Sequence, residues 1–271
     1  MCGQMSIYLC CIARLEGKYI KEFIDYYLGL GIDKIIIADN DHDEDNENLG
    51  SILSGYNQVE ILDYKNKVGY QMKAYTEMYA KYKDEADWIL FCDIDEYLVL
   101  EKDKDIKSFL SKYPSDCEAV VCNWKTYGDN DQVYADYSKP IRERFTKPCP
   151  NAMSQYNFVD DCHVKSFIKG GLPNVNFYSN PHVSTTPLVT YNSIGQRCNN
   201  APFQPVDHST AYFAHYTTKS LQEYCEGKLM RGTADRSYDV FLKTYVNRYF
   251  RINQPTQEKI DWLTQHGFGG V

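Results

Sequence analysis

Apolar runs alternate with amphipathic segments along the first 125 residues of this chain. Ile7 to Ala13 is a continuous apolar run with β-branched members, which is typical of a buried strand. From residue 20 to 28 the apolar positions recur at helical spacing, with charged residues on the opposite face. Further strands are expected at 34–38, 59–62, 88–91 and 119–124, and further helices at 70–82 and 105–112. This alternation predicts an α/β fold whose mostly parallel, Rossmann-like sheet is flanked by helices.

The pattern becomes irregular after about residue 126. Residues 127–205 are rich in proline and asparagine and contain only short apolar pieces, such as Val164 to Ile168. We expect a loop-rich insertion with some antiparallel strands there, on the side where an acceptor would bind. A last short strand is predicted at 212–216, and Ser220 with Glu223 forms a capping box that opens a helix. An aromatic-rich helix is expected at 238–250.

Composition excludes several classes of protein. The net charge of −8 and the pI near 5.3 argue against a nucleic-acid partner. None of the ten cysteines has the Cys-x-x-Cys spacing of a zinc site, and no Gly-x-Gly-x-x-Gly or Walker pattern occurs. We find no signal peptide and no apolar run near the roughly 18 residues that cross a bilayer. A cytoplasmic location is therefore predicted, and peripheral association with the inner face of the membrane stays open.

Two carboxylates follow the apolar strand at 88–91. Asp93 and Asp95 are one residue apart, so on an extended backbone they would project to the same side. Ligands of open α/β sheets bind beyond the carboxyl ends of the strands. Paired carboxylates there suit Mg²⁺ or Mn²⁺ shared with substrate phosphates, as an enzyme using a nucleotide-diphosphate sugar would need. A solvated turn is the alternative.

Polar residues also follow the first two strands. Arg14 and Glu16 come after the first strand, and Asp39 and Asn40 end the second. In a parallel sheet these ends meet at the edge that carries Asp93. Such groups match a nucleoside, which offers a base edge and a ribose diol. Each residue alone is equally explained by capping or by a turn.

A histidine and several basic residues follow the strand at 212–216. His215 ends that strand and would supply imidazole to the divalent ion held by Asp95. Lys219, Lys228 and Arg231 lie within one helix and its exit and would clamp a diphosphate, which the helix start at Ser220 would also attract. The alternatives are a structural histidine and a solvated basic helix end.

These residues resemble a known enzyme family. The segment from Arg14 to Ile20, followed by Leu30 to Asp33, resembles the opening of a family-2-like glycosyltransferase with a GT-A fold, and more narrowly the group related to glycosyltransferase family 92. The resemblance extends over roughly residues 7 to 232. The family usually has asparagine where this chain has Leu15. Counterparts occur in order at 71–75, 91–97, 123–124, 127–130, 143–145, 164–166, 181–182, 215–216 and 219–220.

The resemblance implies a specific chemistry. The donor would be a nucleotide sugar, most simply a UDP-hexose, and the acceptor a glycan or glycolipid. Mn²⁺ or Mg²⁺ would be held by Asp95 and His215, with Asp93 on the ribose or the metal, and displacement would invert the anomeric carbon. The acceptor's proton would go to a carboxylate, for which Asp129 is favoured over Asp131 and Glu143. The expected nucleotide contacts are Ala13, Arg14, Glu16, Asp39, Asn40, Gln71, Lys73, Asp93, Ile94, Lys219 and Arg231.

We therefore predict one glycosyltransferase domain over residues 1–271. Residues 1–125 would bind the nucleotide sugar, 126–235 would receive the acceptor and complete the metal site, and 236–271 would form a helical tail. The open alternatives are a metal-dependent nucleotidyltransferase and a non-catalytic sugar-binding domain with an aromatic surface. A glycosidase fits poorly, because it needs two acids about 5–9 Å apart across a cleft and no metal.

Overall fold

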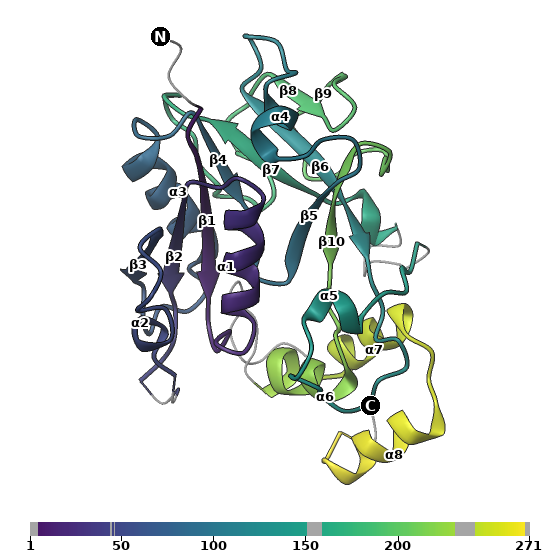
Figure 1. Cartoon of the computed structure of the whole chain (residues 1–271). Coiled ribbons are helices and arrows are strands. Elements are labelled where there is room, and N and C mark those ends of the chain that lie inside the picture. The colour runs from purple at the N-terminus through teal and green to yellow at the C-terminus, as the bar shows by residue number, and fades with distance from the viewer. Residues whose placement is uncertain (1–4, 44, 46, 151–158, 231–241, 269–271) are drawn as a thin grey trace.

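In the computed structural model, four parallel strands form the first half of the central sheet (Figure 1). The structure describes residues 5–43, 45, 47–150, 159–230 and 242–268. The four strands occur where the apolar runs predict them and lie in the order β3-β2-β1-β4, in which β1 is hydrogen-bonded to both β2 and β4. Their bounds are β1 Ile7–Ala13, β2 Lys34–Asp39, β3 Val59–Asp63 and β4 Trp88–Phe91.

The second half of the sheet is mixed, and it contains the antiparallel strands expected after residue 126. β7 runs antiparallel between β4 and β6, and β10 is parallel to β6 but antiparallel to β5. Strand β5, which begins at Glu96 immediately after the turn that follows β4, was not predicted. The bounds are β5 Glu96–Leu100, β6 Ala119–Thr126, β7 Val164–Lys169, β8 Thr190–Asn192, β9 Arg197–Cys198 and β10 Ala211–His215.

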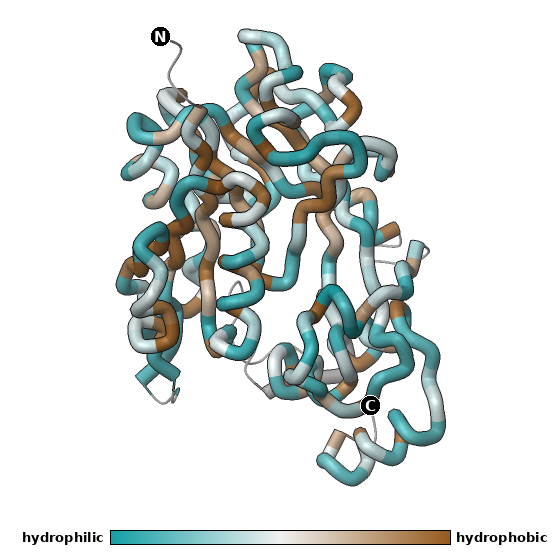
Figure 2. The backbone as a smooth tube through the Cα atoms, in the orientation of Figure 1, coloured by the Kyte–Doolittle hydropathy of each residue, from teal (hydrophilic) through white to brown (hydrophobic). Residues whose placement is uncertain are grey.

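Helices cover both faces of the parallel half, because successive side chains of a buried strand point to opposite faces. Helix α1 (Ile20–Gly29) packs on the face that carries Leu9, and α3 (Gln71–Tyr82) packs on the face that carries Cys10. Figure 2 shows the apolar residues concentrated along these strands, between the two helical layers. Short helices α2 (Leu49–Ile52) and α4 (Ile106–Leu110) complete this part.

The C-terminal helices build a second, smaller apolar cluster away from the sheet (Figure 1). Helix α6 opens with the predicted capping box of Ser220 and Glu223. The predicted helix at 238–250 is present from Leu242, while its first four residues lie outside the described part. None of the helices described is long and apolar enough to cross a membrane. The bounds are α5 Ile141–Arg144, a 3-10 turn Asp160–Cys162, α6 Leu221–Tyr224, a π-helix Cys225–Met230, α7 Leu242–Ile252 and α8 Gln257–Gln265.

Candidate active site

The carboxyl ends of β1 and β2 lie side by side, as expected for parallel neighbours. Ala13 is paired with Asp39 in the register of the two strands, and the backbone N–H of Asn40 donates to the Ala13 carbonyl at 2.8 Å. Because β4 is the parallel neighbour on the other side of β1, the residues after Phe91 reach the same edge. The predicted convergence of three strand ends is therefore present.

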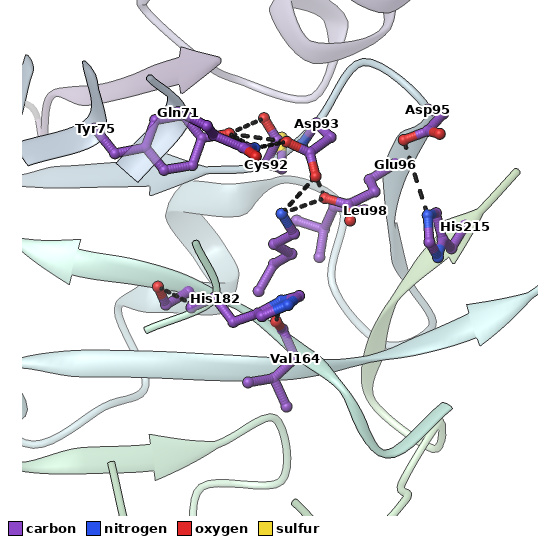
Figure 3. Close-up of polar contacts among 12 residues, drawn as sticks. Gln71, Tyr75, Cys92, Asp93, Asp95, Glu96, Leu98, Val164, His182 and His215 are labelled. Atoms are coloured by element: carbon purple, nitrogen blue, oxygen red, sulfur yellow. Dashed lines mark hydrogen bonds and ion pairs between the residues drawn. The ribbon is translucent and has the colours of Figure 1, made fainter. Parts of the chain in front are cut away.

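Asp93 and Asp95 do not share a side, contrary to the expectation from an extended backbone. Ile94 and Asp95 form a turn that the Glu96 N–H closes by donating to the Asp93 carbonyl at 3.0 Å. The turn sends the two aspartates in opposite directions. Asp93 points toward Gln71 and the β4 side, whereas Asp95 points toward β10 (Figure 3).

Asp93 is held by three donors at the end of β4. Gln71 Nε2 and Tyr75 Oη, both from α3, donate to its Oδ1 at 2.5 and 3.0 Å. Lys165 Nζ donates to Oδ2 at 2.8 Å and lies 3.4 Å from Glu96 Oε2. Lys165 is fully buried on β7. Burial lowers the pKa of its ammonium, but the carboxylates of Asp93 and Glu96 raise that pKa by more, so the net pKa is above the usual range. Both Asp93 oxygens are thus partnered, which fixes the carboxylate.

A three-residue cluster with metal-ligating atoms lies on the other side of the turn. One carboxylate oxygen from each of Asp95 and Glu96 and one His215 ring nitrogen lie within 4.8 Å of one another. The pairing of β10 with β5 places His215 opposite Glu96, and the Tyr216 N–H donates to the Asp95 carbonyl at 2.9 Å. All three ligand side chains are buried. A divalent ion therefore has a carboxylate–imidazole donor set here, with Glu96 beside Asp95 where Asp93 was expected.

Asp95 and His215 have the protonation states that a bound cation needs. Burial raises the pKa of Asp95, but Lys228 at 3.6 Å and Lys219 at 3.9 Å from its Oδ2 lower it well below the usual range. Burial lowers the pKa of His215, which keeps the imidazole neutral. Burial raises the pKa of Glu96, so its carboxyl group would release a proton on binding a cation. Among the residues that the structure describes, no hydrogen-bond partner reaches the buried atoms His215 Nδ1 and Glu96 Oε1. Buried polar atoms are normally partnered, so these two favour a bound ion.

The basic segment after His215 adjoins a cavity. Lys219 has a left-handed backbone, with φ of 53°, and immediately precedes the Ser220 cap of α6. Non-glycine residues adopt this conformation at a cost of the order of 1 kcal/mol and concentrate at functional sites. Lys219 and Lys228 line a cavity of about 200 Å³ whose opposite wall includes Glu16 and Tyr19, just beyond β1. Arg231, the third predicted basic residue, lies outside the described residues.

Of the other predicted nucleotide contacts, most lie at the carboxyl edge of the sheet, where they contact neighbouring loops, and one lies on α3. Ile94 is buried in the turn. Arg14 Nε is paired with Asp45 at 3.0 Å, and Asn40 Nδ2 donates to two backbone carbonyls at 2.8 Å, so both organise loops at the edge. Asp39 Oδ1 accepts the Asp41 N–H at 3.1 Å. Lys73 is exposed on α3, where it is paired with its i+4 neighbour Glu77.

The three carboxylates predicted as bases differ in environment. Asp129 is buried and accepts from Tyr249 Oη and from Lys259 Nζ, which tie it to helices α7 and α8. Asp131 is exposed and paired with Lys147 at 3.0 Å. Glu143 is exposed on α5. The assignment of the base to a carboxylate stays a prediction, and the contacts of Asp129 are those of a structural residue.

Sequence analysis missed two charged members of the site. Glu96 follows Asp95 directly, and only the pairing of β5 with β10 reveals that it faces His215. Lys165 stands in an apolar strand, and a lysine that is buried without a partner is costly, so its position was itself a signal of an acidic neighbour.

Fold and cluster together define an α/β protein with a carboxylate–imidazole centre at the carboxyl edge of its sheet. The chain belongs to glycosyltransferase family 92, whose sequence pattern it matches over residues 7–254. A family 92 glycosyltransferase of Oryza sativa subsp. japonica is 24% identical over 110 residues, which are 40% of this chain and 18% of that relative. The chain thus matches less than a fifth of the relative's length.

Solved structures resemble the chain distantly. S. aureus TarS 1–349 is 16% identical, with a TM-score of 0.41, over 97% of this chain and 80% of that one. Its complex with UDP-GlcNAc is 20% identical, with a TM-score of 0.36, over 49% and 37% of the two chains. The galactosyltransferase LgtC, in complex with donor and acceptor sugar analogues, is 12% identical, with a TM-score of 0.29, over 60% and 57%.

Proposed function

We propose that this protein is a metal-dependent glycosyltransferase that moves a hexose from a UDP-sugar to a glycan or glycolipid acceptor, with inversion. Membership of family 92 supports transfer of a sugar over the nucleotidyltransferase and sugar-binding alternatives. The observation that carries the proposal is the buried cluster of Asp95, Glu96 and His215 beside two lysines.

The residues of the cluster would hold Mn²⁺ or Mg²⁺ through the oxygens of Asp95 and Glu96 and a nitrogen of His215. A divalent ion there supplies Lewis-acid stabilisation of the departing diphosphate, an effect worth several kcal/mol. Lys219 and Lys228 lie close enough to Asp95 to contribute to the same anion site, and they would turn from its carboxylate to the phosphates.

Asp93 has a different role in this proposal. Its two oxygens are already occupied by Lys165 and by the two donors from α3, which holds the carboxylate rigidly at the end of β4. We assign it to the ribose of the donor, because a fixed carboxylate accepts well from a diol. A cytoplasmic location also belongs to the proposal, and the described cysteines, which are all free, are compatible with it.

UDP release from UDP-glucose, UDP-galactose and UDP-N-acetylglucosamine tests the proposal. At least one donor should turn over with Mn²⁺ and stop turning over with EDTA. Asp95→Ala should lower turnover at least about 10³-fold, which corresponds to the several kcal/mol of Lewis-acid stabilisation. Asp84→Asn is the matched control, because Asp84 is exposed before β4. Full turnover by Asp95→Ala in EDTA would refute the metal mechanism.

A further inference from the structure

His182 is held at the carboxyl edge of the sheet by its own backbone. Its N–H donates to Asn180 Oδ1 at 2.9 Å, and its carbonyl accepts from Ser166 Oγ, on β7, at 2.9 Å. Ser166 pairs with Phe91, the last residue of β4. A residue of the irregular insertion is thereby attached next to the turn that carries Asp93 and Asp95.

The His182 ring has a fixed orientation and a defined tautomer. Nδ1 lies 3.0 Å from the Val164 carbonyl oxygen, which can only accept, so Nδ1 carries the hydrogen. In the neutral ring Nε2 is then the nitrogen with the free lone pair. No other described residue makes a hydrogen bond to Nε2. Burial lowers the pKa of His182 well below its usual value, which favours this neutral form.

The ring lies next to the metal-type cluster with one indole between them. His182 packs against Trp124 edge to face, with the ring centroids 5.2 Å apart, and Trp124 contacts His215 at 4.1 Å. Val164, which accepts from the His182 ring, is followed directly by Lys165, the partner of Asp93.

Two of the three carboxylate candidates for the base are less free. Asp129 is occupied by Tyr249 and Lys259, and Asp131 is paired with Lys147. A general base needs an available lone pair and a fixed position near the reacting atoms. His182 has an Nε2 lone pair that no described residue engages, and its ring is fixed at the carboxyl edge of the sheet.

We propose that His182 is the catalytic base, a role that rests on the proposed glycosyltransferase function. Its Nε2 takes the proton of the acceptor hydroxyl as that oxygen bonds to the anomeric carbon. The bond from the anomeric carbon to the diphosphate oxygen breaks with its electron pair, so that the nucleoside diphosphate leaves as an anion. The proton stays on the imidazole until solvent removes it.

Water serves as the acceptor in the test, because hydrolysis of a UDP-sugar needs no known acceptor. The full-length protein with Mn²⁺ and the best UDP-sugar is compared with His182→Asn, whose amide N–H₂ can still donate to the Val164 carbonyl. We expect kcat to fall about 10²–10⁴-fold while KM for the donor changes less than threefold. Added imidazole should increase the hydrolysis rate of His182→Ala at least tenfold.

His208→Asn is the matched control, because His208 also hydrogen-bonds a backbone carbonyl, that of Trp124, at 2.7 Å. It should retain kcat within threefold. The role of His182 is overturned if His182→Asn keeps wild-type kcat, or if it loses UDP binding and rate together. A loss of kcat in Asp131→Asn or Glu143→Gln, with His182→Asn active, would also overturn it. Absence of wild-type turnover would instead refute the proposed function itself, and with it this role.

Discussion

The ion pair between Arg144 and Glu223 is a buried electrostatic contact on which the stability of the fold should depend strongly. Nη1 and Nη2 of the guanidinium donate to the two carboxylate oxygens at 2.8 and 2.9 Å. Tyr19 Oη and Ser220 Oγ donate to the same carboxylate at 2.8 and 2.6 Å. The pair thus joins α5, the start of α1 and the cap of α6, and both side chains are almost wholly buried.

Arg144→Met removes the cation and leaves the Glu223 carboxylate buried. Removing one partner of a buried pair costs about 3–5 kcal/mol. Because Tyr19 and Ser220 still donate to the carboxylate, we expect a loss near the lower end, about 3 kcal/mol in the free energy of unfolding. That is a large fraction of the roughly 5–15 kcal/mol that stabilises a typical protein.

Urea unfolding followed by tryptophan fluorescence measures this loss at pH 7.5. The control is Arg142→Met, since Arg142 is more exposed on the same helix and lies 3.6 Å from Glu22, so it should cost less than about 1 kcal/mol. Burial raises the pKa of Glu223, but hydrogen bonds from Arg144 and Ser220 lower it, and the net pKa is below the usual range of a glutamate. The stabilisation is therefore complete at a pH above the pKa of Glu223 in the unfolded state, and it is lost as the pH falls through the pKa of Glu223 in the folded state. Equal, small losses in both variants would refute the reasoning.

Two further changes test the fold. Burial raises the pKa of Asp41 from 3.8 to about 6, so the folded state holds the proton more tightly and loses stability as the pH rises between these values. Asp41→Asn keeps the acceptor for the Leu15 N–H and should stabilise the protein by about 1–3 kcal/mol at pH 8 but by little at pH 4. Thermal unfolding at both pH values measures this difference, and an equal effect at the two values would contradict it. At Gly170 an added Cβ would lie 1.8 Å from the Ala86 carbonyl oxygen, so Gly170→Ala should lower the free energy of unfolding in urea by at least about 3 kcal/mol. The control Gly29→Ala adds its Cβ in open space and should cost nothing. Similar free energies of unfolding for the two variants would contradict the packing at Gly170.

The parallel half of the fold was predictable because its signal is local. Continuous apolar runs such as Ile7 to Ala13 report burial on both faces, and the helix from Ile20 reports its own amphipathic stripe. The mixed half depends on pairing between distant segments. Nothing local to Glu96–Leu100 indicates that it pairs with β10, so β5 was not predicted.

The sequence indicated several residues of the candidate site, but it did not indicate which of them lie next to one another. Asp95 and His215 were identified from their places at strand ends, and the structure brings them together. Asp93 was expected beside Asp95, but the turn at Ile94 places Glu96 there instead. A turn abolishes the two-residue alternation of side chains on which the prediction relied. The position of His182 depends on long-range hydrogen bonds to β7, which no sequence spacing encodes.

Binding of Mn²⁺ tests the central claim most directly. Electron paramagnetic resonance of free Mn²⁺ gives the affinity of the protein for the ion with and without UDP. The account predicts that UDP tightens Mn²⁺ binding at least tenfold, that His215→Ala removes this coupling, and that Asp84→Asn retains it. Wild-type affinity and coupling in His215→Ala would place the ion elsewhere and contradict the account.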